Sequence, residues 1–216
     1  MLNKQLEKSI SKSQHCQRNW DLSKEITPDD LNTLIHAVTQ CPSKQNETFY
    51  SVTVIKNRKL IEEIHSYTDG FSLHDRSSST VNNDGSLVEG VKTVTNSQTL
   101  ANVLFVFSKD NPDTKRSQES VSHYLSGHEL KVNEDQRLIS LGIASGYLNL
   151  TANLLGYSTG CCSCFDYDKV NKIVQNPMLL MGVGFRDSNR SRLEHHNNRD
   201  FRFPSFPKKI TCNIME

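Results

Sequence analysis

The sequence is short of hydrophobic residues and contains no long apolar run. Hydrophobic residues make up 35% of its 216 positions, and the mean hydropathy is −0.56. Because that is low for a self-sufficient globule of this length, burial in an oligomer interface would supply the missing apolar contact. No stretch approaches the about 20 apolar residues that span a bilayer. The polar segment 1–17 has Leu2, Leu6 and Ile10 spaced four apart, which predicts an amphipathic helix and no signal peptide. The chain is therefore expected to be cytoplasmic, with no membrane partner.

The sequence also lacks an excess of charge of one sign. It has 25 Lys and Arg against 24 Asp and Glu, a formal net charge of +1. No overall field therefore favours nucleic acid, and no nucleic-acid partner is predicted. There is no Gly-x-Gly-x-x-Gly stretch, no Walker loop and no recognisable Ser-His-Asp or Cys-His set. These absences disfavour a Rossmann dinucleotide site, a P-loop and a triad hydrolase, and no catalytic side chain is predicted.

Six cysteines raise the question of metal or thiol chemistry. Three are single, Cys16, Cys41 and Cys212, and three form a cluster, Cys161, Cys162 and Cys164. A structural zinc site would need a second ligand pair, and the only obvious one is His195-His196. Adjacent residues rarely both ligate one tetrahedral ion, so no metal site is predicted. Passive thiols are favoured, with a redox-active dithiol in the cluster as an alternative.

Capping and periodicity signals predict a mixture of helices and strands. Thr27 precedes Pro28 and two acids, which is typical of a helix start, and Pro42 should end that helix by Cys41. The alternating run 49–55 predicts a half-buried strand. Further helices are expected at 58–67 and 134–155, and strands at 100–107 and 178–185. The helix at 134–155 is apolar on most sides, so it should lie in a core or an interface.

Two polar stretches and a polar tail interrupt this pattern. The stretches lie near 68–95 and 108–133, the second with room for a short helix at 117–125. Connections longer than about 12–15 residues are uncommon inside a compact domain, so both are interpreted as lid-like or disordered excursions. The tail 186–216 has no core pattern of its own. The elements do not alternate as in a doubly wound fold, so 1–216 is predicted to be a single α+β domain.

The loop Cys41-Pro42-Ser43-Lys44-Gln45-Asn46 carries a hydroxyl, an ammonium and two amides between a helix and a strand. Such loops often hold polar ligands. Here the chain resembles the nitroreductase family, in which a Pro-Ser-Xaa-Xaa-Asn loop contacts the ribityl and phosphate part of FMN. Segment 18–28 also looks like the N-terminal segment of that family. The resemblance makes Pro42, Ser43, Lys44 and Asn46 candidate cofactor-binding residues.

A second match is the segment 155–166, Leu-Gly-Tyr-Ser-Thr-Gly-Cys-Cys-Ser-Cys-Phe-Asp. In the family, Leu-Gly ends the long helix, and the turn that follows presents backbone amides to flavin N5 and O4. Position by position, these would be the amides of Ser163 and Cys164, where the family more often has an acid and a glycine. The resemblance adds the cofactor-binding candidates Cys161, Cys162, Ser163, Cys164, Asn96 and Gln98, the last two because an asparagine in a similar stretch reads the flavin pyrimidine edge. A plain turn before the strand is an equal alternative for the Asn96 stretch.

The resemblance also implies a phosphate site near the N-terminus. The matching positions read Gln14, Cys16 and Arg18, and only Arg18 is a cation. The family adds a basic residue from the C-terminal tail, for which Arg202 is the first choice. Lys44 would supply further positive charge.

Taken together, the resemblance implies a nitroreductase-like α+β fold with a central, mainly antiparallel sheet flanked by helices. It implies an entangled homodimer whose tail wraps the partner. The implied function is ping-pong hydride transfer from NADH or NADPH through FMN to a nitroaromatic or quinone acceptor. Alternatives are a reductive dehalogenase or flavin-cleaving enzyme of the same family, and a non-catalytic flavin-binding protein.

Overall fold

The computed structural model describes residues 2–81, 83, 86–110, 134–189 and 210–215. Its elements follow one another as α1 (Leu2–Ser13), α2 (Pro28–Thr39), η1 (Lys44–Asn46), β1 (Tyr50–Ile55), α3 (Arg58–Ser66), β2 (Phe71–Val81), β3 (Leu87–Val94), η2 (Ser97–Thr99), β4 (Val103–Lys109), α5 (Glu134–Leu154), β5 (Ser158–Cys162), α6 (Tyr167–Asn171) and β6 (Pro177–Gly184). The predicted strands, and the helices predicted to begin at Pro28 and to span 58–67 and 134–155, agree with these bounds to within a few residues. α1 is shorter than expected and ends at Ser13.

The main sheet has four strands in the order β1-β4-β6-β5, and every neighbouring pair is antiparallel. One row across it runs through Thr53, Val106, Leu180 and Cys162. β1 and β5 are therefore the two edges of the four-stranded sheet. This arrangement confirms the predicted α+β class with an antiparallel sheet.

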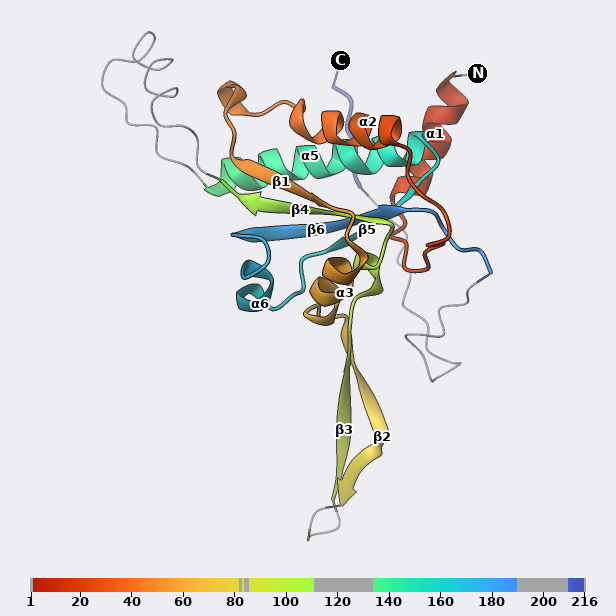
Figure 1. The fold of residues 1–216 in the computed structure, drawn as a ribbon, viewed down its shortest axis with the longest axis vertical. Helices are drawn as coiled ribbons and strands as arrows, with labels where there is room; N and C mark the ends of the chain where they lie inside the picture. The colour runs from red at the N-terminus through yellow and green to blue at the C-terminus, as the bar shows by residue number, and fades with distance from the viewer. Residues whose placement is uncertain (1, 82, 84–85, 111–133, 190–209, 216) are drawn as a thin grey trace, which may run out of the picture.

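Helices cover both faces of this sheet (Figure 1). On one face Phe105 of β4 joins a buried cluster with Leu34 of α2 and Leu148 of α5. On the other face Val106 packs in a cluster with Ile64 of α3. Successive side chains of a strand point to opposite faces, so a central strand between two helical layers must be apolar at every position. That requirement explains the continuous apolar run that predicted this strand.

Local signals fix the ends of α2 as the sequence predicted. The Thr27 hydroxyl accepts a hydrogen bond from the Asp30 backbone N–H at 3.1 Å, and Pro28 occupies the first turn. Such a cap satisfies one of the N–H groups left without a helical partner. α6 begins in the same way, because the Asp166 carboxylate accepts from the Lys169 N–H at 3.1 Å.

The stretch 68–95 differs from its sequence-based interpretation. It holds strands β2 and β3, which pair in an antiparallel hairpin that projects away from the main sheet (Figure 1). The alternative that this stretch is disordered was wrong, because strand pairing uses backbone N–H and C=O groups and does not need an apolar core. The lid-like interpretation stays a prediction. The expected helix at 117–125 and the residues 190–209 lie outside the described residues.

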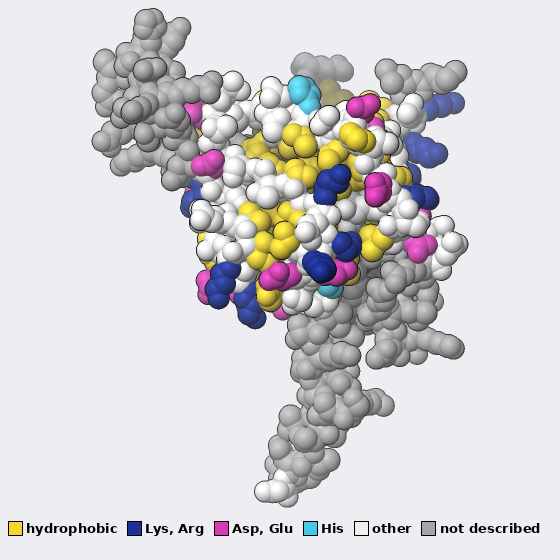
Figure 2. All heavy atoms as spheres, viewed as in Figure 1, with side chains coloured by type: hydrophobic (Ala, Val, Ile, Leu, Met, Phe, Trp, Pro, Cys, Tyr) yellow, Lys and Arg dark blue, Asp and Glu magenta, His cyan; other side chains and the backbone are white. Residues whose placement is uncertain are grey.

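The long helix α5 is only partly buried within one chain. Leu148 is fully buried, whereas Leu138 and Ile139 are 53% and 62% exposed. Figure 2 shows hydrophobic side chains at the surface of one face, among charged ones. No helix in the described part of the chain is both long and apolar enough to cross a membrane.

Candidate functional site

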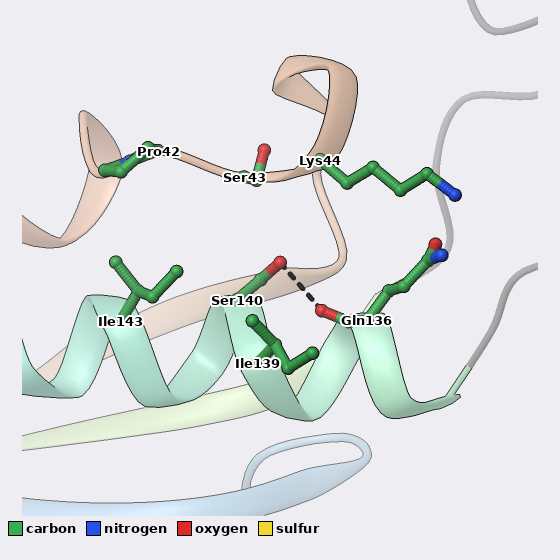
Figure 3. A pocket seen from close by; sticks show the side chains of 7 residues that line it. All are labelled: Pro42, Ser43, Lys44, Gln136, Ile139, Ser140 and Ile143. Carbon is green, nitrogen blue, oxygen red and sulfur yellow. Dashed lines mark hydrogen bonds between the residues drawn. The ribbon is translucent and has the colours of Figure 1, made fainter. Parts of the chain in front are cut away.

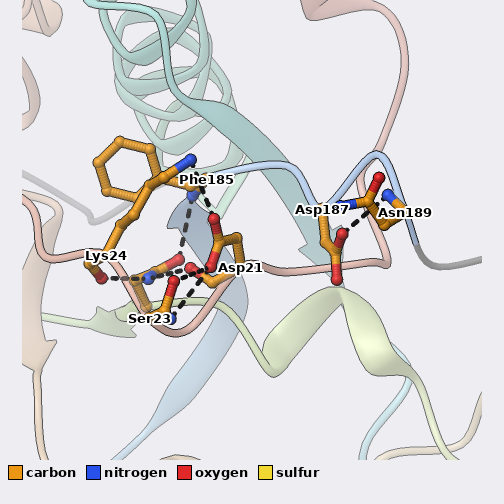
Figure 4. A network of polar contacts seen from close by, with 7 residues as sticks. Asp21, Ser23, Lys24, Phe185, Asp187 and Asn189 are labelled. Atoms are coloured by element: carbon orange, nitrogen blue, oxygen red, sulfur yellow. Dashed lines mark hydrogen bonds and ion pairs between the residues drawn. The ribbon is translucent and has the colours of Figure 1, made fainter.

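The segment that follows α1 is bound to one edge of the sheet by backbone hydrogen bonds. The Gln17 N–H donates to the Thr159 carbonyl of β5 at 2.7 Å, and the Asp21 N–H donates to Phe185 beyond β6 at 2.9 Å. Figure 4 shows Asp21 among its polar contacts beside Phe185. These bonds place Cys16 and Arg18 next to β5, although no regular element contains them.

The three predicted phosphate-site residues have different surroundings in this segment. The Gln14 side-chain amide donates to the Ser11 carbonyl at 3.0 Å, so it turns back toward α1. Cys16 is exposed and directly precedes Gln17, the residue bound to β5. Arg18 is half-buried and is the cation of the set. The predicted helix would have included Gln14 and Cys16, but it ends before them.

The turn η2 lies unusually close to β5 and β6. A Cβ atom added at Gly160 would lie 2.8 Å from Gln98 Cβ, and one added at Gly182 would lie 2.8 Å from Ala101 Cβ. Only glycine allows such an approach. Gln98 is 5% exposed, and its Oε1 atom has no hydrogen-bond partner in the described part of the chain. A buried amide oxygen without a partner is costly unless something else occupies the site.

The Asn96 side chain stabilises the turn η2. Its side-chain oxygen accepts a hydrogen bond from the Gln98 N–H at 3.1 Å, and its own N–H donates to the Thr68 hydroxyl at 2.7 Å. These contacts fit the alternative of a capped turn, and they leave Asn96 less available to a ligand than the sequence suggested.

The loop after β5 presents two backbone amides. Leu155-Gly156 closes α5 as expected, but a strand and not a turn follows, because residues 158–162 pair with β6. The loop itself begins at Ser163. Within the described residues, the N–H groups of Ser163 and Cys164 donate to no protein acceptor. Two adjacent free amides form a donor site for an electronegative atom.

The thiols in this region differ in their protonation. The hydrogen bond from Cys161, helped by the positive charges of Arg18 and His15, lowers the pKa of Cys16 to about 6. The same hydrogen bond raises the pKa of Cys161, and burial raises that of Cys162. The Cys162 thiol donates a hydrogen bond to the Cys164 carbonyl at 3.3 Å. Cys162 is thus a buried thiol that the fold keeps protonated.

The Pro42–Asn46 loop forms a second region, against the first half of α5. Pro42, Ser43 and Lys44 line a pocket of about 350 Å³ together with Gln136, Ile139, Ser140 and Ile143 (Figure 3). The Ser43 hydroxyl donates to the Glu47 carbonyl at 2.7 Å, so it stabilises the loop. Asn46 has φ of +59°, a left-handed conformation that asparagine tolerates. The sequence analysis missed the α5 side of this pocket, although Ile139 and Ile143 are spaced as one helical face.

One chain does not bring the two regions together. The loop joins β1, whereas Cys16, Gln98 and the free amides lie around β5. β1 and β5 are separated by three strand spacings, about 14 Å. The predicted site residues therefore form two separate groups, and Arg202 lies outside the described residues. Within the described ranges, no three His, Cys, Asp or Glu side chains gather as a metal site requires.

The fold has known counterparts among solved structures. A nitroreductase family protein from Clostridium novyi NT has a TM-score of 0.57 and 18% identity, covering 85% of this chain and 86% of that one. Nitroreductase A from Vibrio parahaemolyticus has a TM-score of 0.58 and 14% identity, covering 94% and 78%. A nitroreductase-like protein in complex with FMN from Exiguobacterium sibiricum has a TM-score of 0.58 and 15% identity, covering 91% and 92%. No protein-family model and no curated protein matches the sequence. The chain has the nitroreductase fold.

Proposed function

We propose that this chain is an FMN-dependent oxidoreductase that passes hydride from NADH or NADPH to an electron-poor acceptor such as a nitroaromatic or a quinone. The observation that carries the proposal is the pair of free amides at Ser163 and Cys164 within the nitroreductase fold. Sequence resemblance assigns these two amides to flavin N5 and O4. A cation, Arg18, and an unpartnered amide oxygen, Gln98 Oε1, lie around the same strand and support that assignment.

The residues around β5 fit a flavin in three respects. Two amides can donate to ring acceptors, Gln98 Oε1 can accept from a ring N–H, and Arg18 can pair with the phosphate. When bound, FMN supplies two-electron hydride chemistry. The chain supplies fixed donors where negative charge develops, which needs no acidic or basic side chain.

We also propose that the complete site forms in a homodimer. The Pro42–Asn46 loop and the β5 region carry complementary parts of the predicted FMN site, yet they lie at opposite sheet edges. Leu138 and Ile139, beside the loop, are exposed apolar side chains that a partner chain would cover. A loop from one protomer placed over the β5 region of the other would join the two groups.

The absorbance spectrum of the purified protein tests the proposed function. We expect a flavin spectrum that bleaches when NADH or NADPH is added without oxygen. Flavin that binds but is reduced by neither nucleotide would instead support a flavin-binding protein without catalysis, since the expected phosphate site retains only one cation. A protein that is colourless and takes up no added FMN would overturn the proposal.

Replacing Arg18 by Ala tests the phosphate site. Loss of one charge-assisted hydrogen bond should weaken FMN binding by about 10- to 100-fold, as measured by titration of flavin fluorescence. Lys172→Ala removes an exposed lysine at the end of α6 and is the matched control. Equal FMN affinity of Arg18→Ala and wild type would remove Arg18 from the phosphate site.

A further inference from the structure

Thr68 is a buried polar residue that contacts the loop after β5. It lies between α3 and β2, is 2% exposed and forms an antiparallel bridge with Phe165. On one side of this bridge, the Asp69 N–H donates to the Cys164 carbonyl at 2.9 Å, and a second backbone bond closes the other side at 2.8 Å. The segment around Thr68 therefore holds the loop that carries the two free amides.

The Thr68 hydroxyl joins the same segment to η2. It donates to the His65 carbonyl at 2.7 Å and accepts from the Asn96 N–H at 2.7 Å. The bond to His65 alone would only stabilise the end of α3, whereas the bond from Asn96 reaches 28 residues along the chain. Because the hydroxyl donates one bond and accepts another, the position of η2 relative to α3 is fixed at both ends.

η2 carries the other half of the proposed flavin-ring contacts. The Asn96 side chain accepts from the Gln98 N–H at 3.1 Å, and Gln98 holds the buried Oε1 atom that has no partner among the described residues. The free amides lie on one side of Thr68, and this oxygen lies on the other. A rigid ring needs its donors and acceptors at a fixed spacing, so the residue that joins the two sides controls that spacing.

We propose that Thr68 is a positioning residue for the flavin ring, which keeps the free amides of the loop at the spacing from Gln98 that the ring requires. The inference rests on the proposed flavin function. Thr68 acts through the backbone of the loop and through Asn96. When negative charge develops on the ring, amides that are out of place stabilise it less.

Three variants separate this role from ordinary stability. Thr68→Val keeps the size and the branching of the side chain but removes the hydroxyl, so the Asn96 N–H loses its acceptor. Thr68→Ser keeps the hydroxyl and should restore wild-type behaviour. Thr159→Val is the matched control, because Thr159 is also buried, at 3% exposure, and its hydroxyl donates to the side chain of Asn149 in α5.

Amide hydrogen exchange of the full chain without flavin, followed by NMR, tests the link itself. In Thr68→Val, the N–H groups of Asn96 and Asp69 should both exchange about tenfold faster than in wild type, as expected for the loss of one hydrogen bond. Thr68→Ser and Thr159→Val should leave both rates unchanged. Faster exchange at Asn96 with no change at Asp69 would overturn the proposal, because the loop would then not depend on the hydroxyl.

The midpoint potential of bound FMN tests the consequence for the ring. Thr68→Val should shift it to a more negative value by about 30 mV, which corresponds to a tenfold change in a two-electron equilibrium. Thr68→Ser and Thr159→Val should keep the wild-type potential. A Thr68→Val protein that binds FMN at the wild-type potential would overturn the proposal. A wild-type protein that takes up no FMN would overturn the proposed function instead, and hydrogen exchange would still decide whether Thr68 holds the loop to η2.

Discussion

The β5 region and the Pro42–Asn46 loop are built in different ways. Around β5, backbone atoms from the N-terminal segment, η2 and β6 meet at close range, and Gln98 is almost fully buried. In the loop, Pro42 and Lys44 are exposed, and the Ser43 hydroxyl stabilises the backbone locally. We infer that the β5 region is part of the fold, whereas the Pro42–Asn46 loop can change without unfolding the chain. Substitutions around β5 should therefore cost the most stability, and those of loop side chains that do not support the backbone should mainly alter binding.

The largest effect is expected for Gly182→Ala in β6. The new methyl group would lie 2.8 Å from Ala101 Cβ and would also meet the Gln98 carbonyl oxygen, which belongs to the backbone and cannot turn away. Overpacking of this kind costs about 1–3 kcal/mol, and a backbone clash places it at the upper end. Urea unfolding measures the loss. Ser51→Ala, at an exposed position of β1, is the control and should change stability by less than about 0.5 kcal/mol. A Gly182→Ala protein as stable as wild type would show that the close packing of η2 against β6 is not required for stability.

Mixing two variants tests whether the two regions cooperate across a dimer. Arg18→Glu reverses a charge beside β5, and Lys44→Glu reverses one in the loop. Each variant alone should lose at least about tenfold in FMN affinity, because a cation near the phosphate becomes an anion.

A refolded equal mixture of the two variants should recover binding in about one quarter of its sites, because half of randomly paired dimers are mixed and each mixed dimer has one unaltered site. Bound flavin after gel filtration gives this fraction. No recovery in a mixture that does form mixed dimers would mean that one chain supplies both cations to its own site.

A smaller effect is expected for Asn46→Val at the end of the loop. Asn46 has φ of +59°, where a β-branched side chain is strained by about 1–2 kcal/mol. Asn46→Gly accepts the same backbone conformation and should stay within a few tenths of a kcal/mol of wild type. Thermal unfolding of the two variants separates backbone strain from loss of the amide. If valine were tolerated as well as glycine, the left-handed turn would not be required in solution.

The sequence predicted those parts of the fold that depend on neighbouring residues. The Thr27 cap, the Pro28 helix start and the buried strand β4 all follow from local patterns, and each lies within a few residues of its expected position. The hairpin β2–β3 was missed, because its strands pair through their backbones and polarity was taken to mean irregular structure. The sequence 158–162, Ser-Thr-Gly-Cys-Cys, looked like a turn, yet pairing with β6 makes it a strand.

The candidate site was predicted as a set of residues, but its arrangement was not. The positions of motifs in a sequence do not give distances in space. The separation of Pro42–Asn46 from the β5 region therefore follows only from the order of the strands in the sheet. The position of Cys16 and Arg18 beside β5 depends on how the segment after α1 is bound to that strand through Gln17 and Thr159. No local pattern in either sequence stretch encodes such a crossing.

The smallest effect is expected for Tyr157→Phe, which weakens a link between the start of β5 and α2. The Tyr157 hydroxyl donates to the Asp30 carboxylate at 2.6 Å and joins the start of β5 to the first turn of α2. Asp30 is partly exposed, so solvent screening limits the loss at neutral pH to about 1 kcal/mol.

The pH dependence of that loss identifies the bond. Burial, together with the charge of Asp30, raises the pKa of Tyr157 from 10 to about 12. Between these values the unfolded chain releases the proton before the folded chain does, so this contribution to stability is complete below pH 10 and is lost as the pH rises toward 12. The difference in unfolding free energy between wild type and Tyr157→Phe, measured in urea from pH 7 to 11, should therefore shrink above pH 10. A difference that stayed constant over this range would mean that the hydroxyl does not donate to Asp30, and α2 would then be tied to β5 by apolar packing alone.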